Sequence, residues 1–223
     1  ASVAVVHRFQ EMAGRHWATA DDIHRAVLRA TQDIVALGRG PASAGSTVTG
    51  VALTVRAGRP AWLVFNVGDS RVYLVRQGRL TQVTVDHSKV QELKDAGHVA
   101  ESKQVGRNVI TRAIGGGRAG VPPVDQWTID VEPGDRMLIC SDGLSGELTD
   151  ALIGATLLAH ADPQSAASAL VAAAIESGGR DNVTALVVSA VEVAEGTCEP
   201  GVDEDTVEDD QVLADLAALT TED

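Results

Sequence analysis

An alternating pattern of apolar residues constrains the fold more than any other feature of the sequence. From Ser46 onward, small or β-branched residues recur at every second position, and short turns interrupt the runs at 68–70 and 77–78. A period of two is typical of β-strands, and short connections join antiparallel neighbours. The sequence therefore predicts a meander of antiparallel strands over 46–56, 61–68, 71–77 and 79–85.

Helical patterns and further strands surround this meander. Residues 2–13 place Val3, Val6 and either Phe9 or Gln10 one helical turn apart, which predicts a first helix. Thr19 can cap a second helix that ends near Gly38. The same criteria predict helices over 88–104, 147–158 and 163–177. They predict strands over 108–115, 126–131, 136–142 and 182–191. The order of helices, strands, helices and a final strand favours an α+β layered fold over a doubly wound parallel one.

Composition and charge narrow the function. Hydrophobic residues make up 44% of the 223 residues, but no apolar run approaches the roughly 18–20 residues of a membrane span. Twelve of the 31 acidic residues lie in 192–223, which leaves 19 acids against 18 Lys and Arg residues in the remainder. A nucleic-acid-binding domain needs a basic face, and none is evident.

These properties predict one folded domain over 1–191 and an acidic, disordered tail over 192–223. The N-terminal residues have no basic leader and are not typical of a signal peptide. We therefore expect a cytoplasmic monomer with neither membrane nor nucleic-acid partners.

Three acidic turns adjoin apolar strands and are the candidate functional residues. Asp69 lies between two strands of the meander, Asp142 directly follows the run MLIC, and Asp181 comes just before VTALVV. Carboxylates at the ends of central strands can converge on one point, where their repulsion calls for a cation such as Mg²⁺ or Mn²⁺. Asp-Gly and Asp-Ser are also ordinary turn formers, so each Asp taken alone is equally consistent with a structural role.

Four motifs occur in an order that resembles a known family. They are VGDSRVYLVRQGRLTQVTVDHS, NVITRAIG, LICSDGLSGELTD and GGRDNVTALVV, which span residues 67–188. In this order and spacing they are similar to the bacterial metal-dependent protein serine/threonine phosphatases of type 2C. The resemblance implies a four-layer αββα sandwich, in which two antiparallel sheets are flanked by helices.

The family resemblance also implies the chemistry of the site. Two Mn²⁺ or Mg²⁺ ions bridged by solvent would direct a water onto the phosphorus of phosphoserine or phosphothreonine. By motif, Asp142 and Asp181 correspond to core metal ligands, Asp69 to the ligand of a third, weaker metal, and Asn108 to a further polar contact of that third site. The expected partners are phosphorylated proteins, and serine/threonine kinases with their substrates. Ser70 and Arg71 are expected to brace the Asp69 turn, and His87 to belong to the turn that enters a flap at 88–106.

One part of the family pattern is missing. Members of the family begin with an Arg-containing strand and a strand that ends in Asp-Gly-x-Gly-Gly, whose Asp bridges the two metals; neither precedes the first helix here. We therefore expect a phosphatase fold that is N-terminally truncated. Two further hypotheses stay open: a non-catalytic phosphatase-like binding module that lacks the bridging ligand, and a regulator of sigma-factor partners.

Overall fold

The computed structural model describes residues 1–38, 44–106, 109–118 and 120–193. The predicted disordered tail, apart from its first two residues, and Asn108 lie outside these ranges, so neither prediction is tested. The helices are α1 Ser2–Gln10, α2 Ala20–Ala36, α3 Lys89–Asp95, α4 Val99–Ser102, α5 Asp142–Ser145, α6 Asp150–Ala159 and α7 Pro163–Glu176. The strands are β1 Gly45–Ser46, β2 Val48–Arg56, β3 Arg59–Val67, β4 Arg71–Arg76, β5 Arg79–Gln82, β6 Ile114–Gly115, β7 Asp125–Asp130, β8 Arg136–Cys140 and β9 Ala185–Ser189.

Two antiparallel sheets form the centre of the molecule. One has the strand order β2-β3-β7, the other has the order β5-β4-β8-β9, and β1 pairs with β6 in a small separate ladder. The register of β3 against β2 and β7 places Val64 opposite both Val51 and Trp127. The predicted α+β class is confirmed, and the meander from β2 to β5 lies where the alternating pattern predicts it.

The two sheets pack face to face because their strands alternate between two apolar environments. Trp62 and Val64 of β3 meet Val72, Leu74 and Met137 of the other sheet in one buried cluster. The intervening residues of β3 point to the opposite side of their sheet. There Leu63 and Phe65 form a second cluster with Ile23 of α2 and Phe9 of α1.

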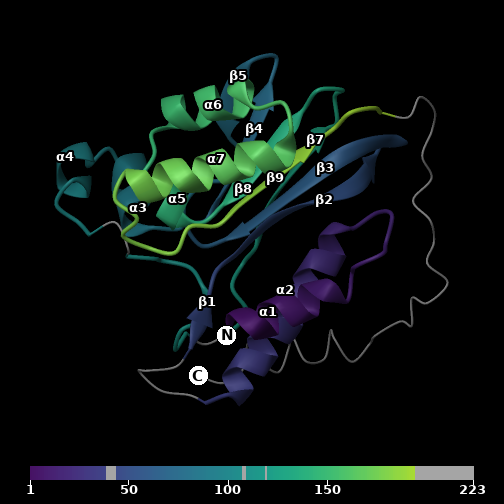
Figure 1. Cartoon of the computed structure of the whole chain (residues 1–223). Helices are drawn as coiled ribbons and strands as arrows, with labels where there is room; N and C mark the ends of the chain where they lie inside the picture. Colours follow the sequence, from purple (N-terminus) through teal and green to yellow (C-terminus); the bar gives the residue numbers. More distant parts are fainter. Residues whose placement is uncertain (39–43, 107–108, 119, 194–223) are drawn as a thin grey trace.

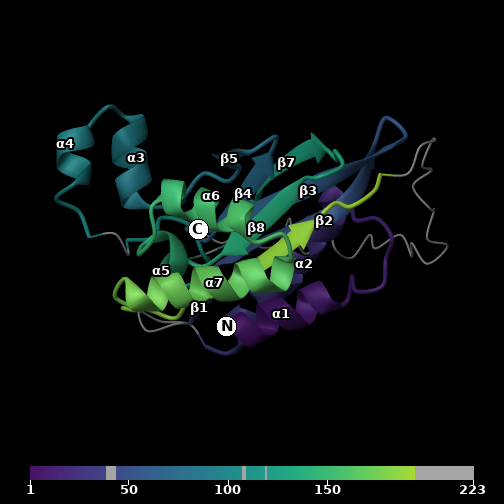
Figure 2. The same cartoon turned by 45° about the horizontal axis from the view of Figure 1, so that its top comes forward.

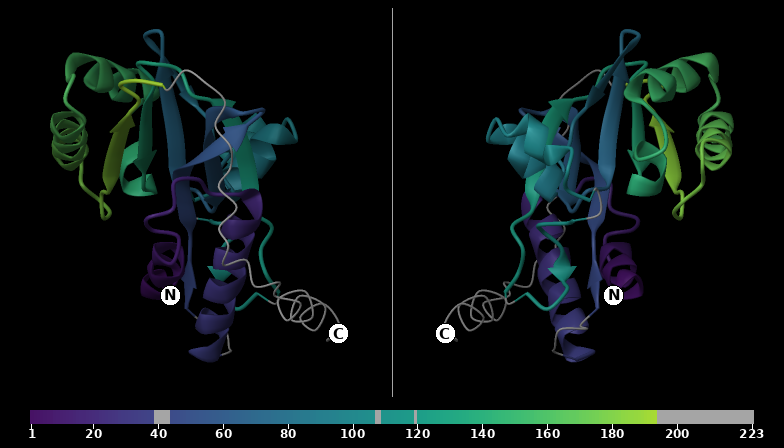
Figure 3. Two further views of the ribbon diagram at one scale, coloured as in Figure 1. Left: turned by 90° about the vertical axis from the view of Figure 1, so that its right-hand side faces the viewer. Right: turned by 90° about the vertical axis from the view of Figure 1, so that its left-hand side faces the viewer.

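Helices cover the outer face of each sheet. A third buried cluster joins Tyr73 and Leu138 of the four-stranded sheet to Ile153 of α6 and Leu170 of α7. Figure 1 shows α6 and α7 along this sheet and α1 and α2 at the other side of the molecule, while α3 and α4 project beyond the strands. Figure 2 shows α6 and α7 over the four-stranded sheet, and Figure 3 shows the two pairs of helices apart. The arrangement is helices, sheet, sheet, helices, as the resemblance implied.

The second helix forms where its local signals predict it. Thr19 accepts a hydrogen bond from the backbone N–H of Asp22, and the Asp22 carboxylate accepts one from the backbone N–H of Thr19. This reciprocal capping box satisfies two amides that the helix itself cannot pair. Arg15 and Arg25 both form ion pairs with the buried Asp22 carboxylate.

The predicted apolar face of the first helix is wrong at Val3 and Val6, although Phe9 does pack against the core. Val3 and Val6 are 80% and 55% exposed, whereas Val5 is 4% exposed and packs with Val27 of α2. Helix α1 ends at Gln10, so it is shorter than the predicted 2–13. A helix of nine residues offers few repeats from which a buried face can be read, and its packing against α2 decides which side is covered.

Several other boundaries differ from the sequence prediction. The segment 88–104 forms two short helices, α3 and α4, rather than one. Of the stretch expected to be extended over 108–115, the structure describes 109–115, in which Ile110 and β6 pair with other segments. Helix α6 begins at Asp150 rather than at 147, because Thr149 caps its first turn. Residues 142–145 form the separate short helix α5. Within the described residues, no helix has both the length and the apolar character needed to cross a bilayer.

A buried ion pair fixes the turn between β7 and β8. The side chain of Asp135 is 0% exposed and accepts hydrogen bonds of 2.7 Å from both Nε and Nη2 of Arg76. The indole N–H of Trp62 donates to the same carboxylate at 3.0 Å, and the backbone N–H of Glu132 donates at 2.9 Å. Burial by itself raises the pKa of Asp135, but these hydrogen bonds outweigh it and hold the pKa below its ordinary value.

We expect Asp135→Asn to lower the free energy of unfolding by about 2–4 kcal/mol, because it removes the buried charge that accepts hydrogen bonds from Arg76 and from the Trp62 indole. The folded pKa of Asp135 is depressed, so its contribution is complete above about pH 4 and is lost as the pH falls through the folded pKa. Urea denaturation between neutral and acidic pH measures both effects. Asp130→Asn is the matched control, since Asp130 is exposed and pairs with Arg56 at 3.5 Å. Equal stability of the two variants would contradict the assignment.

Candidate active site

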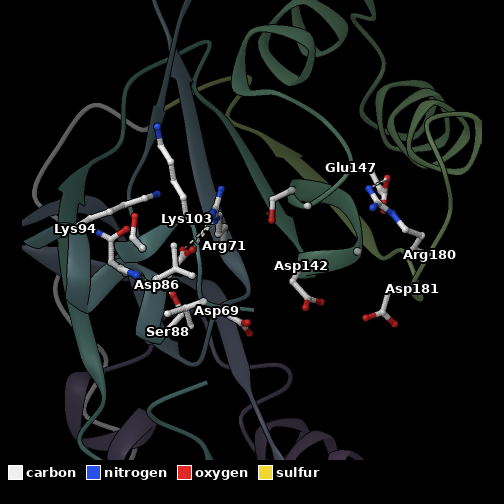
Figure 4. Close-up of a pocket in the computed structure, with 17 residues that line it drawn as sticks. Asp69, Arg71, Asp86, Ser88, Lys94, Lys103, Asp142, Glu147, Arg180 and Asp181 are labelled. Carbon is white, nitrogen blue, oxygen red and sulfur yellow. Dashed lines mark hydrogen bonds and ion pairs between the residues drawn. The ribbon is translucent and has the colours of Figure 1, made fainter. Parts of the chain in front are cut away.

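A pocket of about 750 Å³ lies where the strand ends meet α3 and α4. Four segments line it: the turn after β3, the segment 86–105, the start of α5 and the turn before β9. Asp69, Asp142 and Asp181 all lie on this pocket, and Figure 4 shows their carboxylates directed into the same open space. The structure thus brings together the three acidic turns that the sequence singled out.

The Asp69 turn is held through the main chain of Gly68. Gly68 has φ +124°, and a Cβ at this position would collide with the side chain of Thr47. Only glycine combines this backbone conformation with so close a neighbour. The carbonyl of Gly68 accepts hydrogen bonds from Nδ2 of Asn66 at 3.0 Å and from the backbone N–H of His87 at 2.9 Å. Asp69 itself is buried, at 7% exposure.

The other two carboxylates are placed by direct packing of their turns. Gly143 lies so close to the carbonyl of Asn182 that a Cβ would collide with it. The hydroxyl of Ser141 donates to the carbonyl of Asn182 at 3.1 Å and accepts from the backbone N–H of Thr184 at 3.0 Å. These contacts hold Asp142 and Asp181, each beside one of the touching residues, on the same side of the pocket. Ser141 and Gly143 flank Asp142 in the SDG motif, but the sequence does not reveal that they contact the turn before β9.

The pocket concentrates negative charge. Burial, followed by the charge of Asp142, raises the pKa of Asp69 to about 6. Asp86 also lies on the pocket, but Arg71 binds it through three N–H···O contacts of 2.7–3.2 Å. The charge of Arg71 therefore neutralises Asp86. Within the described part of the chain, Arg71 forms no hydrogen bond with Asp69.

Arg71 also ties the pocket to the helix layer. Its Nη1 donates to the hydroxyl of Tyr73 at 2.9 Å, and that hydroxyl donates to Asp150 at the start of α6 at 3.1 Å. Ser70 lies 3.4 Å from Thr47, hydroxyl to hydroxyl. These contacts agree with the prediction that both residues brace the turn.

His87 is buried behind the Asp69 turn and joins it to β7, the strand beside β3 in the same sheet. Its Nδ1 accepts a hydrogen bond from the backbone N–H of Gly68 at 2.9 Å, and its Nε2 lies 3.0 Å from Asp125 Oδ2. An acceptor Nδ1 carries no proton, so the tautomer that satisfies both contacts has its proton on Nε2. The next residue, Ser88, caps α3, which confirms that His87 belongs to the turn that enters the flap.

The three carboxylates suit a hard divalent cation in an open site. Carboxylate oxygens are the ligands that Mg²⁺ and Mn²⁺ prefer, and a cation here would relieve the repulsion that raises the pKa of Asp69. Among the described residues, no three His, Cys, Asp or Glu side chains lie close enough to enclose a metal on their own. Mg²⁺ is usually held by only one or two carboxylates and keeps several waters, so an open site of this kind suits it.

Comparison with known proteins assigns the family. The sequence profile of the family "Protein phosphatase 2C" matches residues 1–173. The chain belongs to the protein phosphatase 2C family. The matched residues contain the first three of the four motifs, and the fourth begins at Gly178, just beyond them.

Members of the protein phosphatase 2C family share both sequence and fold with the chain. The serine/threonine protein phosphatase PstP of Mycobacterium tuberculosis is 38% identical over 161 residues, which cover 70% of this chain and 29% of PstP. The structure of the serine/threonine phosphatase MsPP from Mycobacterium smegmatis superposes with a TM-score of 0.71 at 35% identity, and covers 85% of this chain and 81% of that one.

A further protein phosphatase 2C structure bears on the metal. The catalytic domain of PstP in complex with two manganese ions superposes with a TM-score of 0.69 at 30% identity, over 86% of this chain and 80% of that one. The chain thus spans most of these catalytic domains but less than a third of the whole PstP protein.

Two substitutions at His87 test separately its hydrogen bond with the Gly68 amide and its contact with Asp125. Asn can present an acceptor near the position of Nδ1, whereas Gln can present a donor near the position of Nε2. We expect His87→Gln to lower the free energy of unfolding by about 1–3 kcal/mol, because the buried Gly68 amide loses its acceptor. We expect His87→Asn to cost less, because Asp125 is half-buried and keeps its ion pair with Arg112. Only His87→Gln should increase the hydrogen-exchange rate of the Gly68 amide, measured by NMR. Equal protection of this amide in the two variants would show that Nδ1 does not hold the turn.

Proposed function

We propose that this chain hydrolyses phosphoserine and phosphothreonine in proteins with the help of divalent cations bound at Asp69, Asp142 and Asp181. The observation that carries the proposal is the convergence of these three carboxylates on one pocket in a chain of the protein phosphatase 2C family. The manganese ions in the PstP structure support Mn²⁺, and the same oxygen ligands also suit Mg²⁺.

The carboxylates would have different roles. Asp142 and Asp181, on turns that touch through their main chains, would hold the core metal pair. Asp69, across the pocket, would hold a further and weaker ion. Divalent cations supply Lewis acidity for the phosphoryl oxygens and lower the pKa of coordinated water. Asn108, which lies outside the described residues, stays a candidate contact of the weaker ion.

The other residues around the pocket would prepare it for this chemistry. The Arg71–Asp86 pair keeps one pocket carboxylate neutralised, so that it does not compete for a cation. His87 and Asn66 fix the main chain of Gly68 and thereby the direction of Asp69. Such fixed positions remove the cost of rearranging ligands during the reaction.

The substrates follow from the same proposal. The relatives are named serine/threonine phosphatases, which supports phosphorylated proteins as substrates of this chain. We propose that these are products of serine/threonine kinases, and the kinases themselves, and that the chain acts on them as a monomer in the cytoplasm.

Phosphate release from a phosphothreonine peptide tests the proposal. We expect turnover with Mn²⁺ or Mg²⁺ and none in excess EDTA. We expect Asp142→Asn to lower the rate by at least about a hundredfold, because even partners of metal ligands cost 10–100-fold when removed. Direct titration of Mn²⁺ by calorimetry gives a second readout that does not depend on turnover.

Asp21→Asn is the matched control, because Asp21 lies in the first turn of α2, away from the pocket. Full activity of this variant alongside loss in Asp142→Asn supports the assignment. Turnover in EDTA equal to that with Mn²⁺ would overturn the metal mechanism. Binding of Mn²⁺ and phosphopeptide without any phosphate release would instead favour a binding module.

A further inference from the structure

Two walls of the pocket carry side chains of opposite charge: one carries carboxylates and the other carries lysines. On the wall formed by α5 and the turn before β9, Glu147 is engaged by a bidentate pair with Arg180, at 2.9 and 3.0 Å. Asp142 and Asp181 are the other carboxylates of that wall. The opposite wall, from residues 88–106 and named the flap here, contributes no carboxylate to the lining.

The flap instead presents two lysines to the pocket. Lys94 comes from α3 and Lys103 directly follows α4, and both line the pocket. Figure 4 shows them on the side away from Asp142 and Asp181. Within the described residues, neither ammonium group has a hydrogen-bond or ion-pair partner.

The acidic residues of the flap are occupied elsewhere. Glu92 pairs with Lys89 at 3.2 Å, Asp95 accepts from Gln91 at 2.7 Å, and Glu101 pairs with His98 at 2.9 Å. None of these three carboxylates lines the pocket. The two lysines therefore place an uncompensated positive charge on the wall that faces the carboxylates.

We propose that Lys94 and Lys103 bind acidic side chains beside the phosphorylated residue, so that the pocket selects phosphopeptides with Asp or Glu next to the phosphoserine or phosphothreonine. This inference rests on the proposed function, in which the phosphoryl group occupies the carboxylate side with its cations. The substrate chain must then leave that side past the flap. Acidic neighbours complement the lysines there, whereas basic neighbours are repelled.

The size of the effect follows from the exposure of the lysines. Exposed ion pairs contribute little each, so we expect the full chain to prefer a Glu-flanked phosphothreonine peptide over its Gln-flanked counterpart by about threefold to tenfold. The preference should appear in KM and in the dissociation constant rather than in kcat. It should shrink between about 20 and 500 mM salt, because salt screens exposed charges.

Two variants of the flap test the inference. Lys94→Gln/Lys103→Gln should abolish the preference, and Lys94→Glu/Lys103→Glu should reverse it. Lys89→Gln is the matched control, since Lys89 lies on the same helix, pairs with Glu92 and does not line the pocket. Fluorescence anisotropy with the two labelled peptides and hydrolysis of the same peptides provide independent readouts.

The outcomes separate this inference from the proposed function. Hydrolysis without any preference for the acidic peptide, or a preference that survives in Lys94→Gln/Lys103→Gln, would overturn the inference alone. If this double variant weakens both peptides and p-nitrophenyl phosphate equally, the lysines grip the phosphoryl group itself and the inference is wrong. A salt-sensitive binding preference without hydrolysis would support the inference and overturn the proposed activity.

Discussion

Strands β3, β4 and β8 bury side chains on both of their faces, and the layers depend on this double burial. Along β3, Trp62 and Val64 pack into the second sheet while Leu63 and Phe65 pack against α1 and α2. A strand that is apolar on both faces can be stable only between two covering layers. The two sheets and the helices on either side therefore depend on one another for burial. Removal of any layer would expose the apolar side chains of the layer beside it.

The same constraint explains where the polar chemistry gathers. Strands with two buried faces leave only their ends for charged groups, so Asp69 and Asp142 lie at the ends of strands, and Asp181 lies in the turn before β9. The ends adjoin one another because the sheets are stacked. Clustered carboxylates are costly, which the raised pKa of Asp69 reflects, and the fold offsets part of this cost by pairing Asp86 with Arg71.

The features that could be predicted from the sequence are those encoded by neighbouring residues. The helix cap at Thr19, the turn at Gly68 and the three acidic strand ends each depend on residues close together in the chain. The contacts it missed join distant segments: Ser141 with Thr184, and His87 with both Gly68 and Asp125. The buried face of α1 was also misread, because its covering partner α2 selects Val5 over Val3 and Val6.

The contact between Gly143 and Asn182 has a mechanical consequence. Side chains can absorb a small displacement by changing rotamer, but two main chains in van der Waals contact cannot. The spacing of Asp142 and Asp181 is therefore as stiff as the backbone that carries them, and a shift of α7 or β9 would reach Asp142 almost undiminished. Helix α7 ends at Glu176, only a few residues before Asp181, so pressure on the outer helical layer would move the two carboxylates together, relative to Asp69. The pocket is thus mechanically connected to a surface on the far side of its own sheet.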